Sequence, residues 1–79
     1  MEFENIEVSS HDEYKGAQQP VSFVWRGAEH HIEQVIDRWY EGSMDSTRMP
    51  LLYFRVKTTR GEIFIIRYHE LFRAWSIMT

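Results

Sequence analysis

The four histidines and the carboxylates are the residues that could bind a metal ion, and their spacing argues against a metal site. His69-Glu70 begins like a zinc-protease helix motif, which requires a second histidine four residues after the first, but that position is Arg73. His30 and His31 are adjacent, so in a strand they point to opposite faces and cannot share an ion. We therefore expect no metal and no cofactor, and we interpret His30 and His31 as exposed polar residues of a hairpin.

The remaining groups that could catalyse a reaction also lack a suitable setting. Acid–base catalysis requires carboxylates that converge, whereas four acids follow one another along a single element, where they keep an edge soluble: Glu29, Glu33, Asp37 and Glu41. Ser43 and Ser46 lie in a polar stretch without the strand–turn–helix context of a nucleophile. The absence of cysteine excludes thiol nucleophiles, and four scattered glycines form no phosphate-binding loop. The sequence predicts no catalytic residue and a chain that is not an enzyme.

Aromatic and basic side chains alternate in the C-terminal part of the chain, and this pattern is the one positive signal for binding. It includes Tyr53-Phe54-Arg55, Arg67-Tyr68 and Arg73-Ala74-Trp75. Small β-barrels that bind single-stranded nucleic acid use aromatic platforms for the bases and cations for the backbone. The competing interpretation is that the aromatics fill the core while the arginines cover them or pair with acids. The candidate residues for binding nucleic acid or a protein partner are Tyr53, Arg55, Lys57, Arg67 and Arg73.

The elements that would position these residues are strands. Alternating apolar and polar residues predict strands at 21–25 and 75–79, and a hairpin from Leu51 to Tyr68 turns at Thr59-Arg60-Gly61. Residues 63–66 are apolar on both faces, which predicts a central strand covered on both sides. We expect an all-β, mainly antiparallel fold of five to six short strands. They would form a strongly bent sheet or a small half-open barrel, with a helical turn or a bend at residues 69–73.

Residues 30–40 permit two interpretations. Ile32, Val35, Ile36 and Trp39 have the spacing of a helical stripe. The alternative is a strand in which a bulge shifts the phase between Ile32 and Val35. No N-cap precedes the segment, and the strand and Gly27 turn before it call for a hairpin partner. These features favour the strand.

The charge of the chain is unevenly distributed, although its net value is only −3. Acids predominate up to residue 47, and bases predominate from residue 48. We predict an acidic, flexible arm over residues 1–19, in which Ile6 and Val8 form at most a short edge strand, and one β-rich domain over residues 20–79. By hypothesis the arm folds over the basic face and competes with anionic ligands, so deleting residues 1–19 would tighten oligonucleotide binding.

Length and composition set the expected location and partners. The 79 residues allow one domain, and no segment approaches the roughly 20 apolar residues of a membrane span. Without cysteine for disulfides and without a basic leader, we expect a cytoplasmic protein that does not bind membranes.

The leading hypothesis is a non-enzymatic module that binds single-stranded nucleic acid or a DNA-repair partner through the basic and aromatic face. The alternative is a protein-interaction subunit that pairs an edge strand and never contacts nucleic acid. We expect a monomer or weak homodimer.

Several short stretches together resemble a known family. They are residues 20–27 (PVSFVWRG), 35–39 (VIDRW), 53–56 (YFRV), 61–64 (GEIF), Arg67-Tyr68 and Trp75. The pattern, over about residues 20–76, resembles a small bacterial domain of unknown function. That domain stands alone or resembles the C-terminal tail of Y-family-like repair polymerase proteins. The resemblance implies a β-rich module near DNA transactions, supplies no catalytic residues, and favours a strand at residues 30–40.

Overall fold

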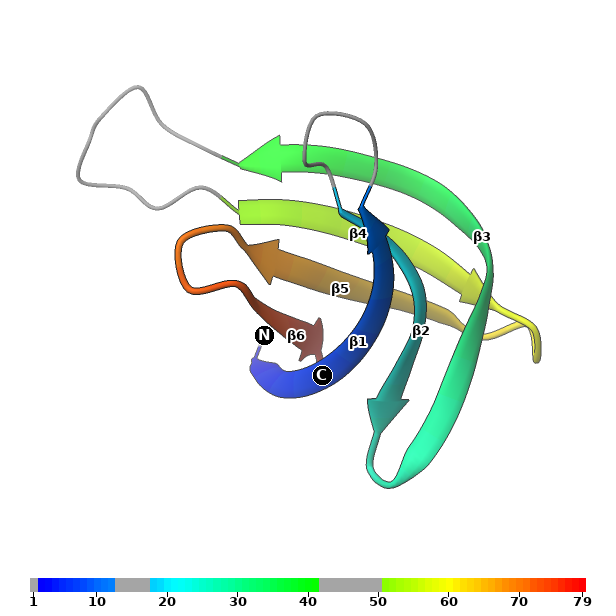
Figure 1. The fold of residues 1–79 in the computed structure, drawn as a ribbon. Coiled ribbons are helices and arrows are strands. Elements are labelled where there is room, and N and C mark those ends of the chain that lie inside the picture. Colours follow the sequence, from blue (N-terminus) through cyan, green and yellow to red (C-terminus); the bar gives the residue numbers. More distant parts are fainter. Residues whose placement is uncertain (1, 13–17, 42–50) are drawn as a thin grey trace.

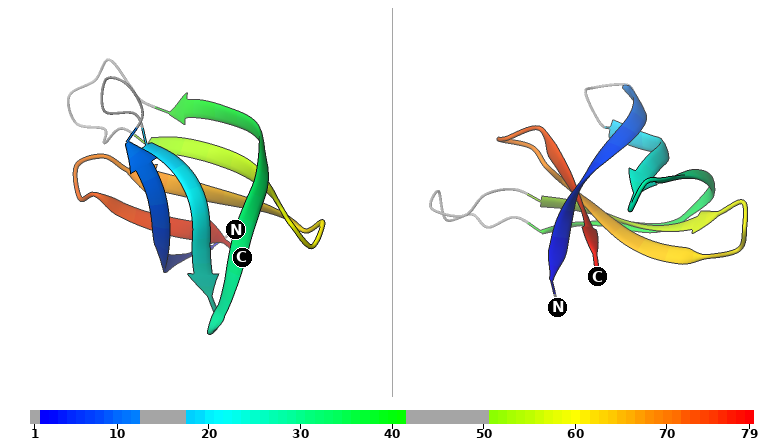
Figure 2. Two further views of the ribbon diagram at one scale, coloured as in Figure 1. Left: turned by 45° about the vertical axis from the view of Figure 1, so that its right-hand side comes forward. Right: turned by 90° about the horizontal axis from the view of Figure 1, so that it is seen from below.

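Alternating apolar and polar residues form six antiparallel strands in the computed structural model, which describes residues 2–12, 18–41 and 51–79. Each strand pairs with the next in the chain, and the first pairs with the last, so the sheet closes into a barrel (Figures 1 and 2). The described residues contain no helix, which confirms the all-β prediction. The strands are β1 (Phe3–Asp12), β2 (Gln18–Trp25), β3 (Ala28–Glu41), β4 (Leu51–Thr58), β5 (Ile63–His69) and β6 (Ala74–Met78).

The first strand differs from the flexible arm that we expected over residues 1–19. Residues 3–6 pair with β6 and residues 7–12 pair with β2, so β1 closes the barrel. Ile6 and Val8 pack against the core, whereas Glu4 and Glu7 are exposed. Backbone pairing on both sides therefore orders a segment whose composition is mostly polar. Deleting residues 1–19 would remove this strand, so the deletion cannot serve as a simple test of competition for the basic face.

The third strand is long because it exchanges partners along its length. Its first residues, 28–31, pair with β2, and residues 32–41 pair with β4. The β4 pairing shifts register twice, and Glu33 and Ile36 are left without a partner in the ladder. The predicted bulge between Ile32 and Val35 is confirmed, and a second bulge follows it. The extra residue at Glu33 explains the three-residue spacing of Ile32 and Val35, which both pack against the core.

The hairpin of β4 and β5 follows the prediction. Gly61 has φ +83°, and its N–H donates to the carbonyl of Thr58 at 2.9 Å. The next connection is a turn over residues 70–73, not a helical turn. The Phe72 N–H donates to Nδ1 of His69 at 3.3 Å, and Arg73 has φ +51°, outside the helical region. The alternative of a bend at 69–73 is the correct one.

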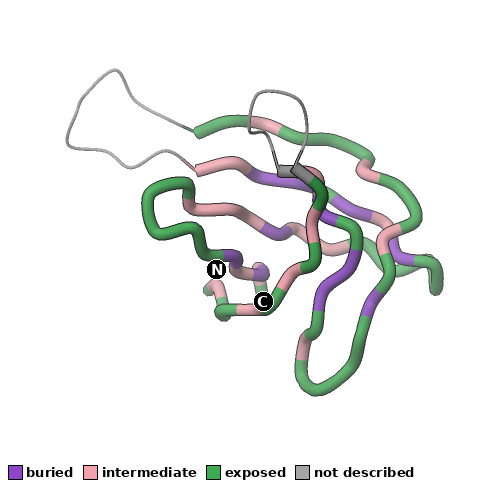
Figure 3. Tube along the Cα trace, in the orientation of Figure 1, coloured by how far each residue is buried: buried purple, intermediate pink, exposed green. Residues whose placement is uncertain are grey.

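The core lies inside the barrel, and its buried members are Phe23, Phe54, Val56, Ile66, Trp75 and Ile77 (Figure 3). They come from β2, β4, β5 and β6. The expectation that β5 is covered on both faces is wrong, since Ile63 is 52% exposed and Ile65 is only partly buried. Among the described residues, no second layer of strands or helices covers the outside of the barrel.

Candidate interaction surfaces

Four of the five predicted binding residues meet on the outer surface of β4 and β5. Tyr53, Arg55 and Lys57 alternate along β4, and Arg67 of β5 lies directly opposite Tyr53. Arg73 lies apart from them, exposed in the turn between β5 and β6. Cross-strand pairing therefore brings together residues that are 14 positions apart in the chain, as the predicted hairpin required.

Tyr53 does not offer a free aromatic face. Its ring stacks on Trp39 at 5.2 Å and 4°, and the edge of Phe3 approaches it at 6.3 Å between centroids. Tyr53 is only 8% exposed as a result. A base requires an accessible ring face for stacking, so Tyr53 is poorly placed as a platform for nucleic acid. Its position agrees better with the interpretation that the aromatics have a structural role.

Two of the three cations on this surface, Lys57 and Arg55, lie beside acids. The Lys57 Nζ is 3.7 Å from a Glu33 carboxylate oxygen, and Arg55 is the register partner of Asp37. The acidic strand β3 thus runs directly alongside the basic strand β4. Part of the charge separation that is evident along the sequence is therefore offset where β3 and β4 pair.

The adjacent histidines occupy different environments. His30 is 8% exposed and stacks on Phe23 with 5.0 Å between ring centroids, so the expectation of an exposed residue is wrong for His30. His31 is exposed, and its Nε2 lies 2.8 Å from a carboxylate oxygen of Glu29. The two rings point to opposite faces as expected, and the described residues contain no cluster of three potential metal ligands.

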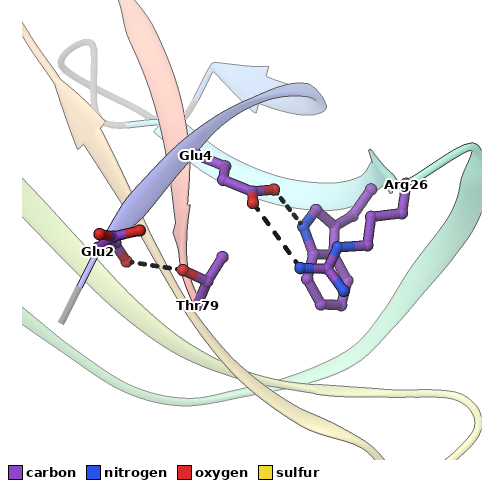
Figure 4. Close-up of polar contacts among 5 residues, drawn as sticks. Glu2, Glu4, Arg26 and Thr79 are labelled. Atoms are coloured by element: carbon purple, nitrogen blue, oxygen red, sulfur yellow. Dashed lines mark hydrogen bonds and ion pairs between the residues drawn. The ribbon is translucent and has the colours of Figure 1, made fainter.

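Trp25 and the adjacent Arg26, another aromatic and basic pair, contribute to the structure of one end of the barrel (Figure 4). Glu4 of β1 accepts a hydrogen bond from Nε1 of Trp25 at 3.1 Å, and its other oxygen lies 3.8 Å from Arg26. The Arg26 guanidinium lies 4.5 Å from the centroid of the Trp25 ring. At this end, Arg26 therefore covers the Trp25 ring, and Glu4 of β1 binds both residues beside the β2–β3 turn. These contacts agree with the interpretation that arginines cover aromatic rings or pair with acids.

A second surface, absent from the predicted residues, is the edge of β3. After four paired positions from the Gly27 turn, β2 and β3 diverge (Figure 1). From residue 32 onward, β3 pairs only with β4 within the described parts of the chain, so its other edge is unpaired. Ile36 is 43% and Tyr40 59% exposed along this stretch. The apolar and polar alternation of a strand does not report whether both of its edges are paired, so sequence patterns could not locate this edge.

The carboxylates that the sequence analysis considered for acid–base catalysis do not converge in the structure. The four acids of β3 are exposed and spread along its length rather than gathered: Glu29, Glu33, Asp37 and Glu41. Ser43 and Ser46 lie outside the described residues. Over the same described ranges, no helix has the length and apolar character needed to cross a membrane.

Comparison with known proteins gives one match. The model of a family described as a domain of unknown function, DUF6504, matches residues 3–76, which run from the start of β1 into β6. No curated protein and no solved structure matches. The predicted resemblance to a small domain of unknown function is confirmed, and the matched region extends further towards the N-terminus than expected. The link to the tail of repair polymerases has no support among these matches and stays a prediction.

Proposed function

We propose that this chain, which belongs to the DUF6504 family, is a non-enzymatic protein-interaction module that pairs an extended segment of a partner with β3. The observation that carries the proposal is the edge of residues 32–41, which lacks a neighbouring strand among the described residues. Unpaired N–H and C=O groups along an edge hydrogen-bond readily to an added strand. The proposal develops the second of the two functions that the sequence suggests.

The side chains of this edge favour a basic partner segment with apolar residues at alternate positions. Glu33, Asp37 and Glu41 outnumber Arg38, which is the one cation of the stretch. Ile36 and Tyr40 supply exposed apolar surface beside these charges. Pairing between two copies of β3 would bring like charges together, which is destabilising in cross-strand pairs. An acidic edge with apolar contacts instead complements a strand that carries lysine or arginine.

A direct test uses an acetylated ten-residue peptide of alternating valine and lysine as the probe. We expect it to slow hydrogen exchange of alternate β3 amides between residues 34 and 41, because added strand hydrogen bonds protect them. The substitution Ile36→Lys places a charge on the edge and should abolish this protection. The matched control is Ile63→Lys, which adds the same charge at a similarly exposed isoleucine on β5 and should leave binding unchanged.

The competing function, binding of single-stranded nucleic acid, is tested with an oligothymidine at two salt concentrations. It would show affinity that falls steeply with salt, and Arg55→Ser would weaken it while Ile36→Lys would not. That result, together with β3 amides that exchange equally fast with and without the peptide, would overturn the proposal. Equal loss of peptide binding in Ile36→Lys and Ile63→Lys would also overturn it, because the peptide would then respond to charge alone.

A further inference from the structure

A hollow of about 170 Å³ lies on the outer surface of the barrel, over β5, β6 and the start of β1. The lining residues that matter for its chemistry are Phe3, Asn5, Arg67, His69, Phe72 and Ser76. The strand β4 separates this hollow from the unpaired edge of β3, so the two features are independent.

Arg67 is held in a defined orientation in this hollow without an acidic partner. Its Nε–H donates to Oγ of Ser76 at 3.0 Å, and its guanidinium carbon lies 3.6 Å from the centroid of the Phe3 ring. No carboxylate of the described residues lies within ion-pairing distance of it. The terminal amino groups of the guanidinium remain for a ligand, and such a fork matches a carboxylate in a bidentate manner.

The opposite wall of the hollow consists of two rings. His69 stacks on Phe72 with 4.5 Å between centroids, and its Nδ1 accepts the backbone N–H of Phe72. A neutral His69 ring therefore carries its proton on Nε2 and offers a second donor. Phe72 is 68% exposed and offers apolar surface to a ligand in the hollow. The hollow thus combines a cation and polar donors with aromatic walls.

We propose that this hollow binds the C-terminal residue of a peptide, with the terminal carboxylate on Arg67 and the side chain between Phe3 and Phe72. A carboxylate supplies the negatively charged partner that Arg67 lacks, and an apolar or aromatic side chain covers the exposed Phe72. A ligand of this kind uses both halves of the lining, whereas a bare anion uses only Arg67 and its polar neighbours.

The test compares N-acetylphenylalanine with its amide, which differs only in the carboxylate. In NMR titrations at millimolar concentrations, the acid should shift the Arg67 Nε–Hε signal, and the amide should bind about tenfold or more weakly. Arg67→Gln should abolish binding of the acid, and Arg67→Lys should retain part of it because the charge remains without the fork. The matched control, Arg60→Gln, alters an exposed arginine in the β4–β5 turn and should have no effect.

Inorganic phosphate and Phe72→Ala separate the two halves of the proposal. Phosphate should bind more weakly than the acid, and Phe72→Ala should weaken the acid while leaving phosphate unchanged. Equal affinity for acid and amide would overturn the role of Arg67. Equal affinity for acid and phosphate, or a Phe72→Ala variant that binds the acid normally, would overturn the aromatic part. Unshifted backbone spectra confirm that each variant is folded.

Discussion

The strands β3 and β4 pair with each other along the whole of β4, yet they differ sharply in burial. Arg55 is the one exposed residue of β4, whereas most of β3 is exposed (Figure 3). The difference follows from their neighbours, because β4 lies between β3 and β5 while β3 beyond residue 31 has β4 alone within the described chain. Position in the barrel therefore decides which strand supports the fold and which remains available for binding.

The largest expected effect is a difference in stability between variants of the register partners Phe54 and Arg38. Phe54 has no exposed surface, so Phe54→Ala should lower the free energy of unfolding by about 3–5 kcal/mol. Arg38→Ala, on the exposed partner, should change it by no more than about 0.5 kcal/mol. Urea denaturation measures both values. Similar losses for the two variants would mean that β3 supports the core as much as β4 does.

A smaller effect is expected from the ring stack that joins the strands. A double-mutant cycle of Trp39→Ala and Tyr53→Ala should give a coupling free energy of about 0.5–1.5 kcal/mol, since the rings stack nearly parallel. The next register pair, Tyr40 and Leu52, serves as the control and should couple less, because Tyr40 is mostly exposed. Equal coupling in both cycles would show that the stack has no special role in holding β3 against β4.

The smallest effect is expected from the ion pair of Lys57 and Glu33. Both side chains are substantially exposed, so the coupling in a double-mutant cycle should be below about 0.5 kcal/mol and should vanish in molar salt. Glu33 is also a bulge residue and has no register partner on β4. A larger coupling that persists in high salt would indicate that the β3 bulge is more rigid than its exposure suggests.

The sequence predicted the elements more successfully than their environments. The β4–β5 hairpin was predicted from alternating apolar and polar residues and a glycine in the turn. The strand at residues 30–40 was predicted because a strand and a glycine turn precede it, as in a hairpin. The acidic segment of β1 was missed, because its pairing depends on backbone groups rather than on an apolar pattern. The burial of His30 depends on Phe23 and Phe64, which the sequence places in different strands.

The candidate sites show the same limit. Arg67 was selected as a binding residue from its aromatic neighbour in sequence, Tyr68, but its important contacts are with Phe3 and Ser76. Phe3 is 64 positions away in the chain, and only closure of the barrel by β1 and β6 brings it to Arg67. Sequence spacing identifies residue types suited to binding, whereas their surroundings depend on long-range pairing.

The Thr79 N–H donates to the Glu2 carbonyl at 2.9 Å, and the Thr79 hydroxyl approaches the same carbonyl (Figure 4), so residues 2 and 79 lie next to each other (Figure 2). A short linker can therefore join residues 2 and 79, and new ends can be opened at the exposed Thr59–Gly61 turn. Such a circular permutant should retain the barrel. The same geometry allows the domain to be inserted into a surface loop of a host protein, because it enters and leaves at one point.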